Sequence, residues 1–144
     1  MTHEDGGHYA AKHPAGAVDP KISEQIGKRE KQGRVTCAAA HEIARRLNCS
    51  PKQVGMNIDM LEKRINRCQL GLFGYGPAMA KAVKPASAVA PDLAAAIEAV
   101  AVDERISCLA AWELAERMNM TRLDVACACE SMGVKIKQCQ LGAF

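Results

Sequence analysis

The sequence predicts a mainly α-helical protein with short β-strands, built as two tandem three-helix units. Two observations support this prediction. Residues 34–73 align without a gap on residues 105–144, and 15 of the 40 aligned positions are identical. Within each copy, apolar residues recur at helical spacing in several segments, and brief β-branched stretches interrupt them. Self-similarity at a fixed shift is typical of a duplicated unit, so the two copies are expected to share one fold.

Composition and the alignment together divide the chain into four segments. Residues 1–19 lack an apolar period and are expected to form a disordered tail. Residues 20–73 are predicted to be the first unit, and residues 91–144 the second. Between them, residues 74–90 are rich in Ala and Pro, which indicates a semi-flexible linker.

The first half of the first unit is predicted to be a helix, a strand and a second helix. A short helix is expected in residues 20–33, because Ile22 and Ile26 lie on one face of it. A β-branched strand at 34–36 separates it from an alanine-rich helix over residues 37–48.

A third helix is predicted over residues 51–62, since its start carries three local signals. Ser50 can cap the helix, Pro51 suits the first helical position, and Gln53 can complete a capping box. Three apolar residues form its predicted buried stripe: Val54, Ile58 and Leu61. A strand is expected to follow at 64–69.

The second unit is predicted to repeat each of these elements. Its expected elements are a helix from Pro91, a strand at 105–107, helices at 108–118 and 122–132, and a strand at 134–140. Each copy then ends in the phrase CQLGxF, at 68–73 and 139–144. We expect this phrase to close its own unit, with Leu and Phe filling the core and Gly allowing a tight bend.

The stretch EIARRLNCSPKQVGMNIDMLEKR resembles a helix-turn-helix, with a capped turn between two helices. Together with the preceding helix and the flanking strands, about 55 residues in each copy resemble the winged helix-turn-helix family. The resemblance implies that the second helix of the motif enters the major groove of double-stranded DNA, while flanking basic residues contact phosphate. It implies a DNA-binding protein similar to a transcription regulator.

The resemblance places the candidate DNA contacts in the first copy. The outward positions of its second motif helix include Lys52, Gln53 and Asn57, and the two amides could pair with adenine. Five further basic residues could clamp phosphate: Lys63, Arg64, Arg67, Arg45 and Arg46. Charge agrees with this placement, because residues 20–84 hold 13 Lys/Arg against 5 Asp/Glu, a net charge of +8.

The second copy is not expected to bind DNA, because residues 85–144 hold 5 Lys/Arg against 8 Asp/Glu, a net charge of −3. We expect it to serve assembly, either by packing on the first copy or by forming a homodimer. Four residues on the outer face of helix 122–132 form the candidate protein interface: Leu123, Cys127, Ala128 and Ser131. The alternative function is therefore an accessory module that grips a protein partner, such as a metalloenzyme subunit, without DNA.

A third hypothesis concerns the cysteines. Cys37 and Cys68 match Cys108 and Cys139, and four sulfurs could hold zinc or an iron–sulfur cluster. No C-x2-C pair is present, and the histidine near Cys37 has a tryptophan as its counterpart, so no metal site or cofactor is predicted. Buried cysteine acting as a small hydrophobe is expected instead.

Several classes of protein are disfavoured by what the sequence lacks. No phosphate-binding loop, nucleophile elbow or H-E-x-x-H motif is present, so an enzyme is not expected. No apolar run is long enough to span a membrane, no export signal is evident, and the cysteine count of seven is odd. These features favour a cytoplasmic protein with reduced thiols.

Overall fold

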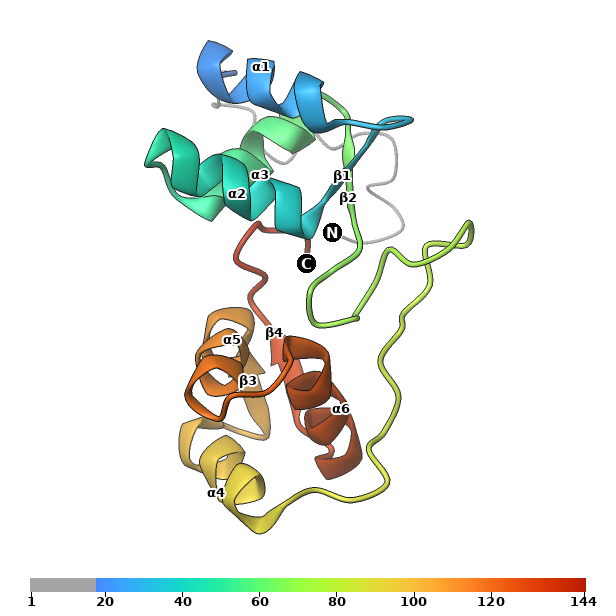
Figure 1. The fold of residues 1–144 in the computed structure, drawn as a ribbon, viewed down its shortest axis with the longest axis vertical. Coiled ribbons are helices and arrows are strands. Elements are labelled where there is room, and N and C mark those ends of the chain that lie inside the picture. The colour runs from blue at the N-terminus through green and yellow to red at the C-terminus, as the bar shows by residue number, and fades with distance from the viewer. Residues whose placement is uncertain (1–17) are drawn as a thin grey trace. The chain divides into compact units, whose positions relative to one another are not determined.

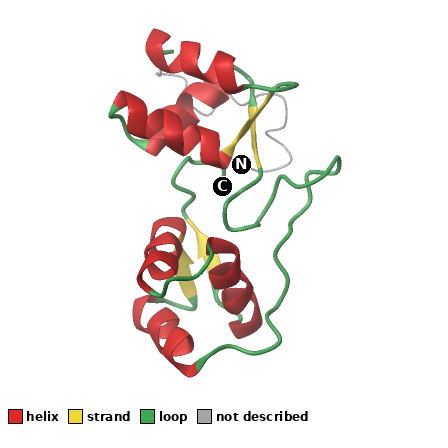
Figure 2. Ribbon diagram, in the orientation of Figure 1, coloured by secondary structure: helices red, strands yellow, loops and turns green. Residues whose placement is uncertain are grey.

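The computed structural model describes residues 18–144, and this part of the chain is mostly helical with short strands (Figures 1 and 2). The expectation of a disordered tail falls on residues 1–19, which lie outside the described range except for Val18 and Asp19. The chain divides into two compact units. The described residues of unit 1 are 18–68 and 140–144, and those of unit 2 are 69–139.

Unit 1 is a three-helix assembly with one pair of strands. Its elements are α1 (Pro20–Arg29), β1 (Arg34–Thr36), α2 (Cys37–Leu47), α3 (Pro51–Met60) and β2 (Arg64–Asn66). Strand β1 pairs with β2 in parallel, and Val35 lies opposite Ile65. Parallel strands need a crossover connection, which the helix pair α2–α3 provides.

Unit 2 repeats the same order of elements. They are α4 (Pro91–Val100), β3 (Arg105–Ser107), α5 (Cys108–Arg117), α6 (Arg122–Met132) and β4 (Lys135–Lys137). Strand β3 pairs with β4 in parallel, and Ile106 lies opposite Ile136. The predicted fold class is therefore confirmed at the level of a mainly helical protein with short strands.

Side-chain caps lie at most helix starts, including the one predicted at Ser50. The Ser50 hydroxyl accepts a hydrogen bond from the N–H of Gln53, whose side chain accepts one from the N–H of Ser50, so the capping box is present. Thr36 and Thr121 cap α2 and α6 in the same way, without the reciprocal bond. Helix α2 ends at Asn48, which adopts the left-handed conformation (φ 53°).

Several predicted elements are longer than the observed ones, and three of them differ by three residues or more. Helix α1 ends at Arg29 instead of Gly33, because Glu30 is already extended at φ −70°, ψ 139°. The predicted strands 64–69 and 134–140 end at Asn66 and Lys137. In both copies the next residue, Arg67 or Gln138, has a positive φ, which interrupts an extended chain.

Each unit includes residues from a CQLGxF phrase, but those residues come from the other repeat. Residues 140–144 belong to unit 1, whereas residues 69–73 belong to unit 2. Leu70 and Leu141 are fully buried, as predicted. The phenylalanines are not core anchors: Phe144 is 40% exposed and Phe73 is half-buried. The expectation that each phrase closes its own unit with both Leu and Phe is thus wrong.

Part of the predicted linker, residues 74–90, contacts other residues of unit 2. The carbonyl of Gly71 accepts hydrogen bonds from the N–H groups of Ala82 and Val83, at 2.8 and 3.0 Å. Val83 is buried, and the N–H of Ala86 donates to the carbonyl of Cys127 on α6. One hydrogen bond to α6, two to Gly71 and the burial of Val83 therefore hold part of a segment that composition alone marks as a linker.

Candidate functional site

The first turn of α3 carries the exposed part of the predicted DNA-reading helix. Lys52 and Gln53 are both exposed. The side-chain oxygen of Gln53 is engaged by the Ser50 N–H at 3.0 Å, so its amide is oriented by the capping box. The side chains of Lys52 and Gln53 are therefore both accessible at the N-terminal end of α3.

Asn57, which was expected on the outward face of the same helix, is buried. Only 4% of it is exposed, and both ends of its amide are occupied. Its Oδ1 accepts a hydrogen bond from the N–H of Asp19 at 2.7 Å, and its Nδ2 donates to the carbonyl of Gln53 at 2.8 Å. The expected outward position is wrong because the segment preceding α1 covers this side of α3.

A second side of α3 is covered at Gly55. A Cβ atom placed on Gly55 would overlap the backbone of Leu141, so residues 140–144 lie directly against the helix. With Val54 and Ile58 facing the core, the exposed surface of α3 is concentrated in its first turn.

The predicted phosphate contacts differ in how far neighbouring carboxylates neutralise them. Arg46 pairs with Glu42 at 3.1 Å, and half-buried Lys63 lies 3.4 Å from Glu30. Three exposed arginines form no ion pair with another residue of the described part of unit 1: Arg45, Arg64 and Arg67. Lys52 is equally exposed and shares this property.

Glu42 links two helices of unit 1 through charge. Its carboxylate accepts a hydrogen bond from Arg29 of α1 at 3.0 Å and pairs with Arg46 of α2. The hydrogen bond and charge of Arg29, followed by the charge of Arg46, lower the pKa of Glu42. Glu42 therefore carries its charge at neutral pH and reduces the positive potential on this side of α2.

The strand ends form a second basic cluster. Arg34 and Arg64 are direct cross-strand partners, and Lys31 bridges to Arg34 through paired backbone hydrogen bonds. Like charges on paired positions repel each other, so the folded chain gains from any anion that binds between them. Counting the described residues of unit 1, 11 Lys/Arg stand against 6 Asp/Glu, a net charge of +5.

The predicted protein interface on α6 is only partly accessible. Ala128 is 2% exposed, so it cannot contact a partner. Cys127 is half-buried, and its carbonyl is taken by Ala86. Leu123 and Ser131 remain exposed. Ala128 lies three residues after Val125 and directly before Cys129, both buried, so the expected outward position of Ala128 is wrong.

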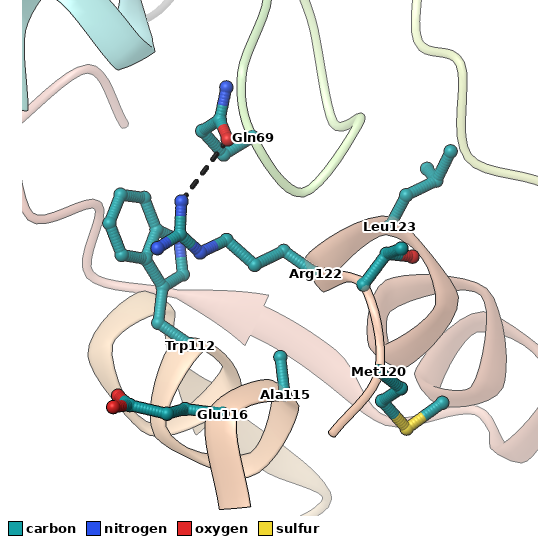
Figure 3. Close-up of a pocket in the computed structure, with 8 residues that line it drawn as sticks. Gln69, Trp112, Ala115, Glu116, Met120, Arg122 and Leu123 are labelled. Carbon is teal, nitrogen blue, oxygen red and sulfur yellow. Dashed lines mark hydrogen bonds between the residues drawn. The ribbon is translucent and has the colours of Figure 1, made fainter. Parts of the chain in front are cut away.

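Unit 2 contains a groove that the sequence reasoning missed (Figure 3). The guanidinium carbon of Arg122 lies 3.5 Å from the centroid of the Trp112 ring, and Nη1 donates to Oε1 of Gln69 at 3.1 Å. The space has a volume of about 580 Å³, and its lining comprises Gln69, Trp112, Ala115, Glu116, Met120, Thr121, Arg122 and Leu123. A signal existed in the repeat alignment, because Trp112 and Arg122 replace His41 and Pro51 together.

The cysteines show the burial of small core residues. Cys37, Cys68 and Cys108 are buried, and Cys139 is half-buried. Burial raises the pKa of Cys129 to about 11. Within residues 18–144, no group of three or more His, Cys, Asp or Glu side chains is placed to hold a metal ion. No helix of this part of the chain is long and apolar enough to cross a lipid bilayer.

Comparison of the chain with family models, with curated proteins and with solved structures found no match.

Proposed function

We propose that this protein binds double-stranded DNA through the basic surface of unit 1, with phosphate contacts supplying most of the affinity. The observation that carries the proposal is the turn between α2 and α3. There three residues separate α2 from α3, and an exposed Lys52–Gln53 pair lies in the first turn of α3. This arrangement resembles the helix-turn-helix motif, whose second helix presents its N-terminal residues to base edges.

Charge supports a phosphate-directed mode. The N-terminal end of a helix attracts anions, because the positive end of its dipole lies there. Here Lys52 adds a full charge at that end, and Arg45 adds another near the end of α2. Two further exposed arginines, Arg64 in β2 and Arg67 just after it, add phosphate contacts.

Base reading is expected to be narrow. Of the two candidate amides, only Gln53 is exposed, since Asn57 is engaged on both sides. One bidentate amide contact discriminates by about 1–3 kcal/mol, and Gln53 can form it only when its Oε1 leaves the Ser50 N–H. Phosphate contacts act on any sequence. We therefore expect modest sequence preference and a strong dependence of affinity on salt.

The test is fluorescence anisotropy with a labelled duplex and the full chain, from about 50 to 200 mM salt. Arg64→Gln has a matched control, because its counterpart in unit 2 is Lys135, an exposed cation at the same place in β4. Arg64→Gln should weaken binding and reduce the log–log salt slope by about 0.9, the value for one phosphate contact. Lys135→Gln should change neither quantity.

Gln53→Ala separates base contact from phosphate contact, and it needs a stability control because it also removes the capping box. It should reduce preference among duplex sequences while leaving the salt slope unchanged. The proposal fails if the full chain does not bind duplex DNA at low salt, or if Arg64→Gln and Lys135→Gln have equal effects.

The alternative, a protein-interaction module that uses the outer face of α6, has less support. Segment 74–90 packs on that helix through Ala86 and through the Lys81–Glu130 ion pair at 3.5 Å. It would gain support if a defined protein co-purified with the wild-type chain but not with a Leu123→Asp variant.

A further inference from the structure

The two copies of the phrase CQLGxF are exchanged between the units. Residues 69–73 follow β2 of unit 1 in the chain but belong to unit 2, and residues 140–144 follow β4 of unit 2 but belong to unit 1. The leucine of each copy is fully buried, with Leu70 at 0% and Leu141 at 1% exposure. Each unit therefore completes its core with a segment that is not part of its own repeat.

On unit 1 this segment lies against α3 in a space that only glycine leaves open, called the groove at Gly55 below. Gly55 lies within α3, and a Cβ at this position would overlap the carbonyl group of Leu141. A Cβ atom placed on Gly27 of α1 would have no neighbour within 4 Å, so the close contact at Gly55 is not shared by this other helical glycine. The absent side chain at Gly55 thus creates a site for the backbone of Leu141.

The connection to this groove is short and turns sharply. Only Gln138 and Cys139 separate the end of β4 from the first residue assigned to unit 1. Gln138 has φ 55°, and its counterpart Arg67 has φ 48°. Non-glycine residues with positive φ are uncommon, and both copies place one at the point where the chain leaves its own repeat. Both copies of the repeat therefore share the turn through which the chain leaves its own unit.

From these observations we propose that the groove at Gly55 is a binding site for the segment Gln140–Phe144, and that a second copy of this chain can supply that segment in trans. The groove recognises the segment without a covalent bond at the contact itself. A change at the two-residue connector is enough to direct the segment to a neighbouring molecule, as in domain swapping. The product is a dimer in which two chains exchange residues 140–144.

The covalent connection favours the intramolecular arrangement at low concentration. A short tether gives an effective concentration in the millimolar range, so the wild-type chain is expected to be mostly monomeric at micromolar concentration. Exchange between chains becomes measurable when a substitution weakens either the segment 140–144 or the groove at Gly55 within one chain.

Two full-length variants provide this test. Leu141→Ala keeps an intact groove but supplies a weakened segment, and Gly55→Ala keeps an intact segment but blocks its own groove. Neither variant can form a good contact with itself. When they are mixed in equal amounts, the segment of the Gly55→Ala chain can enter the groove of the Leu141→Ala chain.

Light scattering after size exclusion measures the outcome. Each variant alone should elute near the 15.4 kDa mass of one chain, and the mixture should contain a species of twice that mass. A double variant, Gly55→Ala with Leu141→Ala, should form no such species with itself. If the mixture stays monomeric up to about 1 mM, the effective concentration of the tether, exchange between copies is wrong.

A peptide-binding experiment provides a second test in case the variants above fold poorly. A labelled peptide of residues 138–144 is titrated into the conservative variant Leu141→Val, whose segment is weakened but still apolar. It should bind at least tenfold more tightly than to a Leu141→Val chain that also carries Gly55→Ala. Equal binding to both chains, or none to either, would show that Gly55 does not form a recognition site.

Discussion

The Oδ1 atom of Asn57 accepts a hydrogen bond of 2.7 Å from the backbone N–H of Asp19. Asp19 in turn caps α1, because its carboxylate accepts from the N–H groups of Lys21 and Ile22. One amide of α3 thereby holds the start of α1. Asn57, which was expected to contact DNA bases, therefore joins α3 to the start of α1.

Replacing Asn57 by Ala should destabilise unit 1 by about 1–3 kcal/mol, because the Asp19 N–H loses its acceptor in a partly buried site. Urea unfolding followed by circular dichroism measures the change. Lys52→Ala, on the exposed first turn of the same helix, should stay within about 0.5 kcal/mol. Equal effects of the two substitutions would contradict the structural role of Asn57.

Gly55→Ala and Gly27→Ala form a matched pair of substitutions in helices. Alanine is favoured over glycine in a helix by about 0.5–1 kcal/mol, and Gly27 has no neighbour in its way, so Gly27→Ala should stabilise the chain. Gly55→Ala should instead destabilise it by about 1–3 kcal/mol, because the new methyl group displaces Leu141. Thermal unfolding distinguishes the two signs. A stabilising Gly55→Ala would mean that Leu141 does not rest on this position.

The stacking of Arg122 on Trp112 should contribute measurable coupling within unit 2. A cation over an indole ring is worth about 0.5–1 kcal/mol at accessible sites. A double-mutant cycle with Arg122→Met and Trp112→Leu isolates this pairwise part. Coupling near zero would indicate that the lining of the groove around Gln69 is held by packing alone.

Glu42 should make part of the stability depend on pH. Its pKa is lowered in the folded chain by Arg29 and Arg46, so its contribution is present above the ordinary value of 4.5 and is lost as pH falls through the folded value. Glu42→Gln should therefore reduce the free energy of unfolding at pH 7, with the difference from wild type shrinking toward pH 3. Glu24→Gln, in the exposed pair with Lys28, is the control and should show a smaller difference at pH 7. A Glu42→Gln effect that is constant over this range would contradict the assignment.

The local signals in the sequence determined where most elements lie. Ser50 and Pro51 set the start of α3, and α6 has the predicted bounds Arg122–Met132, because capping and helical period act over a few residues. The repeat of 71 residues likewise determined that both copies share one order of elements. What a periodic pattern specifies is the apolar face of a helix, and Val54 and Ile58 are buried as that pattern requires.

Only the tertiary structure decided which polar positions are covered and which unit each closing phrase completes. Asn57 accepts a hydrogen bond from Asp19, 38 residues away in the chain, and Ala128 lies on the buried face of α6. The two copies of the phrase CQLGxF are nearly identical. The phrase itself therefore does not indicate whether it completes its own unit or the other one. That choice depends on the short turns at Arg67 and Gln138 and on the space above Gly55, which exist only once the helices have packed.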